Sequence, residues 1–166
     1  MNPVDITTQE GSGYLYYLYA DRFLTNAHAG TIFAKTPENS YQTIRVNQSG
    51  FVLLAGEGKA ALYKNSAKIC DLKVPGDQTL RWYVNKDNFY ALSRNSIKTL
   101  VQNDWKTIYQ GENLTCLAFS TNKLTVGTKD GYLIINPLTG KILQPLKKEL
   151  PVSSINDLLV FNNTRV

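Results

Sequence analysis

The chain has 166 residues, a formal net charge of +5 and an aromatic content of 11%, which includes ten tyrosines. The positive charge is spread along the sequence without a run of about five like charges, so we expect no nucleic-acid partner. No stretch of about 18 apolar residues occurs, which excludes a membrane-spanning helix. The length suits one domain, 1–166, and the aromatic content favours strands over helices.

Short strands separated by polar turns recur along the whole chain. The first unit, 14–40, begins with the aromatic segment 14–20 and continues with strands at 21–27 and 30–34. Residues 1–13 end in Gly11-Ser12-Gly13 and are expected to form an irregular lead-in. The first unit is therefore predicted to be short and to lack its outer strand.

The second and third units each contain four predicted strands. The second, 41–76, has them at 42–46, 51–55, 60–63 and 67–72. The third, 77–113, has them at 79–84, 89–92, 97–101 and 105–109. Glycine and asparagine separate these strands, and the intervals are too short for a helical crossover between parallel strands.

The fourth unit, 114–150, shows the pattern most clearly. Leu124, Val126 and Thr128 alternate with residues of the opposite face, as in a strand with one face in a core. Lys129-Asp130-Gly131 then supplies a tight turn, because Asp-Gly readily adopts positive φ values. The second strands of the four units are predicted to begin near residues 23, 51, 89 and 124, and 151–166 repeats the opening of a unit.

A characteristic series of turn and strand residues runs from the fourth unit into 151–166. It consists of Gly127, Thr128, Gly131, Tyr132, Asn136, Pro137, Gly140, Pro151, Ile155 and Leu158. This series resembles the two-component regulator propeller repeat over the last quarter to third of the chain. The resemblance implies β-propeller blades of the kind that build extracytoplasmic sensor domains of bacterial hybrid histidine kinases and some surface proteins. The Trp-x-Gly-Thr strand that usually follows in that family is missing, because the chain stops at Val166.

The predicted architecture is therefore all-β, with about three and a half to four four-stranded antiparallel blades at 14–40, 41–76, 77–113 and 114–150 and the start of another at 151–166. An ordinary β-sandwich also has many short strands and is the alternative. Propellers usually close with about four to eight blades. The chain is therefore expected to belong to a larger propeller, to pair with a second copy, or to form a small four-bladed ring.

The sequence offers little for catalysis. His28 is the only histidine, so neither a multi-histidine metal site nor a histidine-based triad is expected. Cys70 and Cys116 fall in different units and lack the spacing of a zinc site, which favours two free thiols over a disulfide. We expect a protein without enzymatic activity, metal or cofactor.

Binding is the better hypothesis, because a propeller gathers loops from successive blades on one face. The loops that enter each blade, and those that join its second and third strands, supply carboxylates, amides and cations suited to a polar ligand. The candidate ligand-binding residues are Glu57, Asp77, Gln78, Arg94, Asn95, Glu112, Asn113, Lys129 and Asp130. For any single one of them, an ordinary solvated turn is the simpler interpretation. Tyr14, Tyr16, Tyr17, Trp82 and Tyr83 have the chemistry to stack on sugars, but packing between blades is the expected role for most of them.

Two functions remain open on this basis. The first is a sensor propeller at the periplasmic or extracellular face that binds a carbohydrate or another polar ligand. The second is a protein-interaction scaffold similar to the WD40 class, although the Trp-Asp and Gly-His signatures of that class are missing. The start of the chain has no secretory signal, which leaves a cytoplasmic location as the alternative. Self-association, or contact with further blades of a parent protein, is expected in either case.

Overall fold

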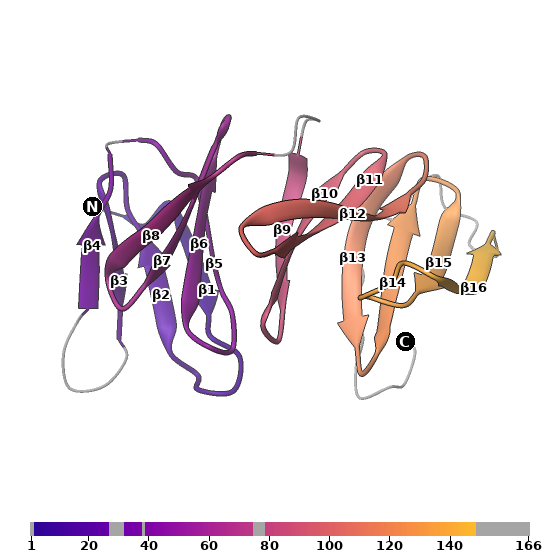
Figure 1. Ribbon diagram of the computed structural model, residues 1–166, viewed down its shortest axis with the longest axis horizontal. Helices are drawn as coiled ribbons and strands as arrows, with labels where there is room; N and C mark the ends of the chain where they lie inside the picture. Colours follow the sequence, from indigo (N-terminus) through magenta and orange to yellow (C-terminus); the bar gives the residue numbers. More distant parts are fainter. Residues whose placement is uncertain (1, 27–31, 38, 75–78, 149–166) are drawn as a thin grey trace. The chain divides into compact units, whose positions relative to one another are not determined.

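The computed structural model describes residues 2–26, 32–37, 39–74 and 79–148 (Figure 1). Within these residues the chain forms sixteen strands and no helix, so nothing in the described part is a helix that could span a membrane. The predicted all-β fold is confirmed.

The strands form four four-stranded sheets, each in chain order and each built from antiparallel neighbours. Sheet 1 contains β1 (Asp5–Thr8), β2 (Leu15–Leu18), β3 (Arg22–Thr25) and β4 (Ile32–Lys35). Sheet 2 contains β5 (Thr43–Val46), β6 (Phe51–Gly56), β7 (Lys59–Lys64) and β8 (Ala67–Leu72). Sheet 3 contains β9 (Thr79–Asn85), β10 (Asn88–Ser93), β11 (Ser96–Val101) and β12 (Asp104–Gln110). Sheet 4 contains β13 (Leu114–Ser120), β14 (Lys123–Thr128), β15 (Gly131–Ile135) and β16 (Ile142–Lys147).

The first sheet begins earlier than the sequence analysis expected. The supposed lead-in contains β1, and Ile6 pairs with Tyr17 of β2, so the first blade has four strands rather than a truncated set. The prediction that Phe23 opens a second strand was wrong, because Phe23 lies in β3. With four residues, β1 is too short to show a clear alternation, and the glycines after it conceal a turn between strands.

The correction makes the repeat more regular. The second strands begin at residues 15, 51, 88 and 123, so successive blades are separated by 36, 37 and 35 residues. Sheets 2, 3 and 4 lie inside the predicted ranges 41–76, 77–113 and 114–150. The predicted start of a further blade at 151–166 lies outside the described residues.

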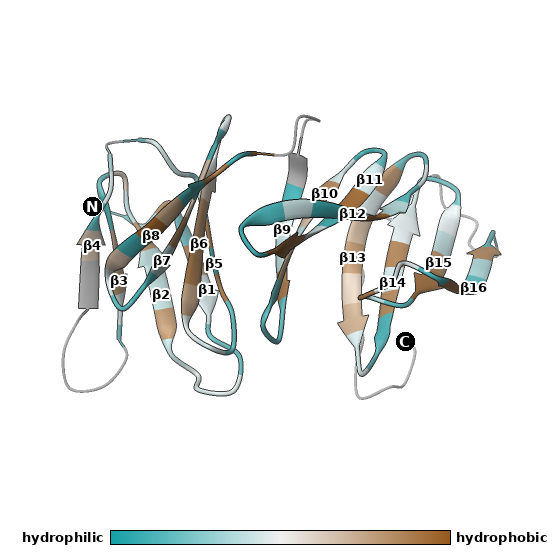
Figure 2. Cartoon of the chain, in the orientation of Figure 1, coloured by the Kyte–Doolittle hydropathy of each residue, from teal (hydrophilic) through white to brown (hydrophobic). Residues whose placement is uncertain are grey.

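The contacts of the chain define two compact units. Of the described residues, the first unit takes those up to Val74 together with Val84–Phe89 and Leu100–Asp104, and the second takes the remainder. Apolar residues concentrate in the strands and polar residues in the turns (Figure 2). The core of the first unit joins sheets 1 and 2 through Tyr16, Leu18, Phe23, Ala34, Tyr41, Ile44, Val46, Val52, Leu54, Ala61 and Tyr63. The core of the second unit contains Tyr90, Leu92, Ile97, Leu114, Leu117, Leu124, Val126, Leu133 and Ile135.

The turn between β9 and β10 belongs to the first unit and is held there by hydrogen bonds. The buried Asn47 donates from Nδ2 to the carbonyl of Asp87 at 3.1 Å, and the amide of Ser49 donates to Oδ1 of Asp87 at 2.9 Å. The amide of Lys86 donates to Oε2 of Glu10 at 2.9 Å. Residues far apart in the sequence thus fix this turn with directed polar contacts.

The two cysteines are free thiols, as predicted. Cys116 is buried, whereas Cys70 on β8 is only partly buried. Burial raises the pKa of the Cys70 thiol, so Cys70 lacks the lowered pKa of a reactive cysteine.

Buried tyrosines should make the fold sensitive to alkali. Burial raises the pKa of Tyr90 and of Tyr83 in the second unit, so the folded chain holds these phenolic protons more tightly than the unfolded chain. Their contribution to stability is complete below the unfolded tyrosine pKa of about 10 and is lost as pH rises above it. A titration of phenolate absorbance, followed together with circular dichroism, should show these tyrosines ionising only as the chain unfolds. Ionisation of all ten tyrosines at one common pH with the fold intact would contradict this.

Candidate functional site

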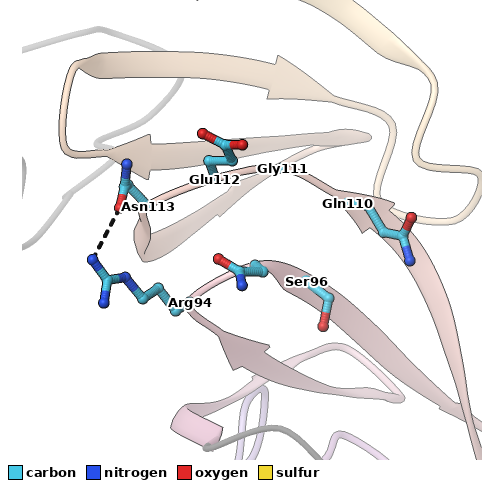
Figure 3. A pocket seen from close by; sticks show the side chains of 7 residues that line it. Arg94, Ser96, Gln110, Gly111, Glu112 and Asn113 are labelled. Carbon is cyan, nitrogen blue, oxygen red and sulfur yellow. Dashed lines mark hydrogen bonds between the residues drawn. The ribbon is translucent and has the colours of Figure 1, made fainter.

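A wide, open depression of about 790 Å³ lies on the second unit. Its lining comes from the β10–β11 turn, the start of β11 and the connector from β12 to β13. Figure 3 shows the side chains of the connector and of the turn around the same space. The lining residues are Arg94, Asn95, Ser96, Gln110, Gly111, Glu112 and Asn113.

A pair of buried hydroxyls sets the β10–β11 turn. Ser93 ends β10 and Ser96 begins β11, and their Oγ atoms lie 2.9 Å apart. Oγ of Ser93 also accepts the amide hydrogen of Ser96 at 3.0 Å. The hydroxyl of Ser93 thus satisfies polar groups inside the turn, and Arg94 and Asn95 are presented at its exposed tip.

The connector is joined to this turn mainly through main-chain atoms. The amide of Gly111 donates to the carbonyl of Asn95 at 3.1 Å, and the amide of Leu114 donates to the carbonyl of Arg94 at 2.9 Å. Nη2 of Arg94 donates to Oδ1 of Asn113 at 3.3 Å, the contact marked in Figure 3. The backbone positions around the depression are therefore preorganised, while the tips of Arg94 and Glu112 remain exposed.

The β14–β15 turn joins the same assembly. The amide of Lys129 donates to the carbonyl of Asn113 at 3.0 Å. Oγ1 of Thr128 donates to the carbonyl of Gly131 at 3.0 Å and accepts from the amide of Asp130 at 3.2 Å, so it serves this turn as Ser93 serves the preceding one. Asn113, in the left-handed region at φ +54°, is thereby bonded to both turns.

Six of the predicted site residues are brought together in this way. Arg94, Asn95, Glu112 and Asn113 line the depression, and Lys129 and Asp130 occupy the turn bonded to Asn113. Glu57 is exposed in the β6–β7 turn of the first unit, whereas the residues that line the depression belong to the second unit. Asp77 and Gln78 lie outside the described residues.

Three lining residues, Ser96, Gln110 and Gly111, were not among the predicted site residues. Gln110 and Gly111 follow the strand predicted at 105–109, and Ser96 precedes the strand predicted at 97–101. A signal for the turns was present, because Ser93 and Thr128 occupy equivalent ends of second strands. Strand ends could not be aligned to single residues before the sheet registers were known.

The chemistry of the depression is polar and close to neutral. Arg94 and Glu112 contribute one charge of each sign, and the amides of Asn95, Gln110 and Asn113 offer donors and acceptors. The lining contains no histidine, cysteine or aromatic side chain, and the described part of the chain holds no group of three residues suited to a metal ion. Such a surface can pair with the hydrogen-bonding groups of a polar ligand.

Most of the aromatic residues considered for sugar stacking pack within the units, as expected. Tyr16 and Trp82 are only 8% and 9% exposed. Tyr14 packs against the first core, and Tyr83 lies against the second core with its ring 6.4 Å from that of Phe119. Tyr17 remains half-buried on sheet 1. The structure therefore supports the expected packing role for most of these residues.

No protein-family model and no curated protein matches the chain. Among solved structures, the chain is similar to Kluyveromyces lactis Hsv2p, with 14% identity and a TM-score of 0.66 over 91% of this chain and 51% of that one. A chain of the mitotic checkpoint complex gives 15% identity and a TM-score of 0.64 over 93% and 56%. The N-terminal domain of Nup159 gives 11% and 0.62 over 89% and 44%.

These neighbours are β-propeller proteins, and they establish that the four sheets have the fold of propeller blades. The chain spans about half the length of the structures that it matches. Several neighbours have protein-interaction roles: one belongs to the mitotic checkpoint complex, and another, BBS1N, was solved in complex with ARL6DN.

Proposed function

We propose that this chain is a non-catalytic binding domain and that the depression around Arg94 and Asn113 takes a polar segment of a partner protein. The observation that carries the proposal is the depression that the β10–β11 turn and the β12–β13 connector form together, with Asn113 of the connector bonded both to Arg94 and to the β14–β15 turn. Loops held by a rigid sheet scaffold are where binding residues concentrate. A preorganised rim also lowers the entropy that binding costs.

The lining favours a peptide over other ligands. Amide side chains can pair with both the N–H and the carbonyl of a peptide group, and Arg94 and Glu112 can select side chains of opposite charge. The depression is open rather than enclosed, which suits an extended segment or a loop.

Carbohydrate sensing is the second candidate, because residues 124–166 resemble the two-component regulator propeller repeat. In that case the chain acts at the periplasmic or extracellular face, and the amides around the depression bind sugar hydroxyls. Sugar sites commonly include an aromatic platform, and the lining residues provide none. A peptide partner therefore fits the chemistry of this depression better.

The test is a binding screen of the purified chain against a library of random peptides and an array of oligosaccharides. For a ligand found in either set, Arg94→Ala should weaken binding about tenfold or more, since hydrogen bonds to a charged group contribute about 1.5–3 kcal/mol. Asn113→Gly should weaken it too, because glycine keeps the left-handed backbone while removing the amide.

The matched control is Arg22→Ala, which removes an exposed arginine of sheet 1 that pairs with the adjacent Asp21. It should leave the affinity unchanged. Peptide binding lost with Arg94 supports the first candidate, and glycan binding lost with Arg94 supports the second. Ligands that bind Arg94→Ala and Asn113→Gly as tightly as the original chain would place the function elsewhere.

A further inference from the structure

The charge of the chain is divided unequally between its two units. Among the described residues, the first unit carries eight lysines and arginines and seven aspartates and glutamates. The described residues of the second unit include nine lysines and arginines but only two carboxylates, Glu112 and Asp130. The rest of the chain adds one basic and four acidic side chains, too few to offset this excess of positive charge. The second unit is therefore the basic part of the protein.

The first unit also neutralises part of its own charge. Three of its cations form ion pairs with carboxylates: Arg22 with Asp21, Arg45 with Asp5, and Lys68 with Asp71. In the described part of the second unit, two carboxylates cannot neutralise nine cations. The positive charge that is left over attracts anionic groups from about one Debye length, roughly 8–10 Å at moderate salt.

Four of these cations lie at the end of sheets 3 and 4 that carries the depression. Arg94 lines the depression, and Lys129 lies in the β14–β15 turn that is bonded to the connector. A Cβ on Gly131 of this turn would overlap the carbonyl of Lys147 and lie 3.3 Å from the Cα of Lys148, so the end of β16 passes directly beside the turn. Arg94, Lys129 and Lys148 are exposed, and Lys147 is half-buried. We call these four residues the basic rim.

The two carboxylates of the second unit interrupt the basic rim. Glu112 lines the depression, and Asp130 follows Lys129 in the β14–β15 turn. A nucleic acid carries a regular series of phosphates and would place some of them against these carboxylates, and the lining has no aromatic side chain on which a base could stack. A peptide can place its carboxylates opposite the cations and its amide groups opposite Glu112 and Asp130. The arrangement of charges therefore favours a peptide over a nucleic acid.

We propose that the partner segment that binds at the depression is acidic and that the basic rim selects it. This inference rests on the proposed function and adds the charge of the ligand to it. Charged groups around a binding surface speed the encounter with a ligand of opposite charge and disfavour ligands of like charge. The amides of the lining hold the main chain of the segment, and the rim attracts its carboxylates.

The experiment selects short peptides from a random display library on the full chain and compares their net charge with that of the library. The bound peptides should be more negative than the library, and replacing their Asp and Glu by Asn and Gln should weaken binding. The affinity of a selected peptide, measured by fluorescence anisotropy, should fall about tenfold between about 50 and 500 mM salt, because salt screens the attraction. An affinity that does not change with salt would contradict the proposal.

Charge reversal tests the basic rim itself. The double variant Lys129→Glu, Lys148→Glu should weaken binding of the selected peptide about tenfold, since two exposed attractions become repulsions. The matched control is Lys123→Glu, Lys141→Glu, which changes the charge of the unit equally at two exposed lysines at the opposite end of sheet 4, where β14 and β16 begin. The control should change the affinity by less than about twofold. Equal losses in the two double variants would overturn the role of the rim.

Circular dichroism checks that each variant is folded, and Lys129→Gln, Lys148→Gln provides a milder change of the same two residues. Neutral or basic peptides that bind the chain and depend on Arg94 would overturn the acidic ligand while supporting the proposed function. A library from which no peptide binds would overturn both. A single-stranded oligonucleotide that binds more tightly than the selected peptides and displaces them would overturn the choice of a peptide.

Discussion

Replacement of Gly140 by alanine should destabilise the chain by about 3 kcal/mol or more. Gly140 closes the turn between β15 and β16 at φ +69°, a left-handed conformation that costs alanine about 1–2 kcal/mol. A Cβ at this position would overlap the carbonyl oxygen of Ile108 in β12, a backbone atom that cannot move without shifting its strand. The added methyl group therefore opposes the close approach of this turn to sheet 3.

The turn around Gly140 is otherwise tightly built, so the clash has no easy relief. Oδ1 of Asn136 accepts the amides of Leu138 and Thr139 at 2.9 and 3.0 Å, and the amide of Gly140 donates to the carbonyl of Asn136 at 2.9 Å. Urea denaturation monitored by circular dichroism measures the loss. Because natural domains are stable by about 5–15 kcal/mol, the change should be a large share of the total.

Gly58→Ala is the matched control for this prediction. Gly58 has a similar φ of +66° in the β6–β7 turn, but a Cβ there would meet nothing within 4 Å. Gly58→Ala should reduce the free energy of unfolding only by the strain of a left-handed alanine, about 1–2 kcal/mol. Equal losses for the two variants would show that the contact with Ile108 contributes nothing and that backbone strain accounts for both.

Most of the fold follows from turn chemistry that is visible in the sequence. Asn136-Pro137 with Gly140, and Asp130-Gly131, mark the turns of sheet 4, and the strands between them are rich in β-branched residues. The same logic located sheets 2 and 3. It failed at β1, where four residues with the pattern Asp5-Ile6-Thr7-Thr8 carry too little alternation to be distinguished from a loop. Pairing with β2, a tertiary effect, makes this segment a strand.

The sequence predicted those residues of the candidate site that lie in the loops between strands. Arg94, Asn95, Glu112 and Asn113 were identified because polar loops between strands on one end of a propeller must lie near one another. Ser96 and Gln110 were missed because their role depends on where a strand ends, and strand ends are set by main-chain bonds such as that from Gly111 to Asn95. Sequence patterns do not encode those bonds residue by residue.

The second large effect is expected at Asn47, which is 4% exposed at the start of the β5–β6 turn. Its Nδ2 donates to the carbonyl of Asp87, and its Oδ1 accepts the amide of Phe51 at 2.8 Å. Asn47→Ala leaves both partners without this side chain and should cost about 2 kcal/mol, the range for buried polar groups that lose a hydrogen bond. Urea denaturation again provides the measurement.

Asn47→Asp tests separately the hydrogen bond that the Asn47 side chain donates and the one that it accepts. The introduced carboxylate can still accept from Phe51, but it cannot donate to the carbonyl of Asp87 and it lies near the Asp87 side chain, which binds Ser49. The loss should therefore be at least as large as for Asn47→Ala, about 2–3 kcal/mol near neutral pH. It should shrink as pH falls toward the usual aspartate pKa of about 3.9, because a protonated carboxyl group can donate.

Gln48→Ala is the control, since Gln48 is exposed and joins Lys86 and Gln9 through its main-chain amide and carbonyl. It should change the free energy of unfolding by less than about 0.5 kcal/mol. If Asn47→Ala were as mild as Gln48→Ala, apolar contacts alone would hold the β9–β10 turn. If it is severe and acid partly rescues Asn47→Asp, the donated hydrogen bond to Asp87 is what fixes that turn in the first unit.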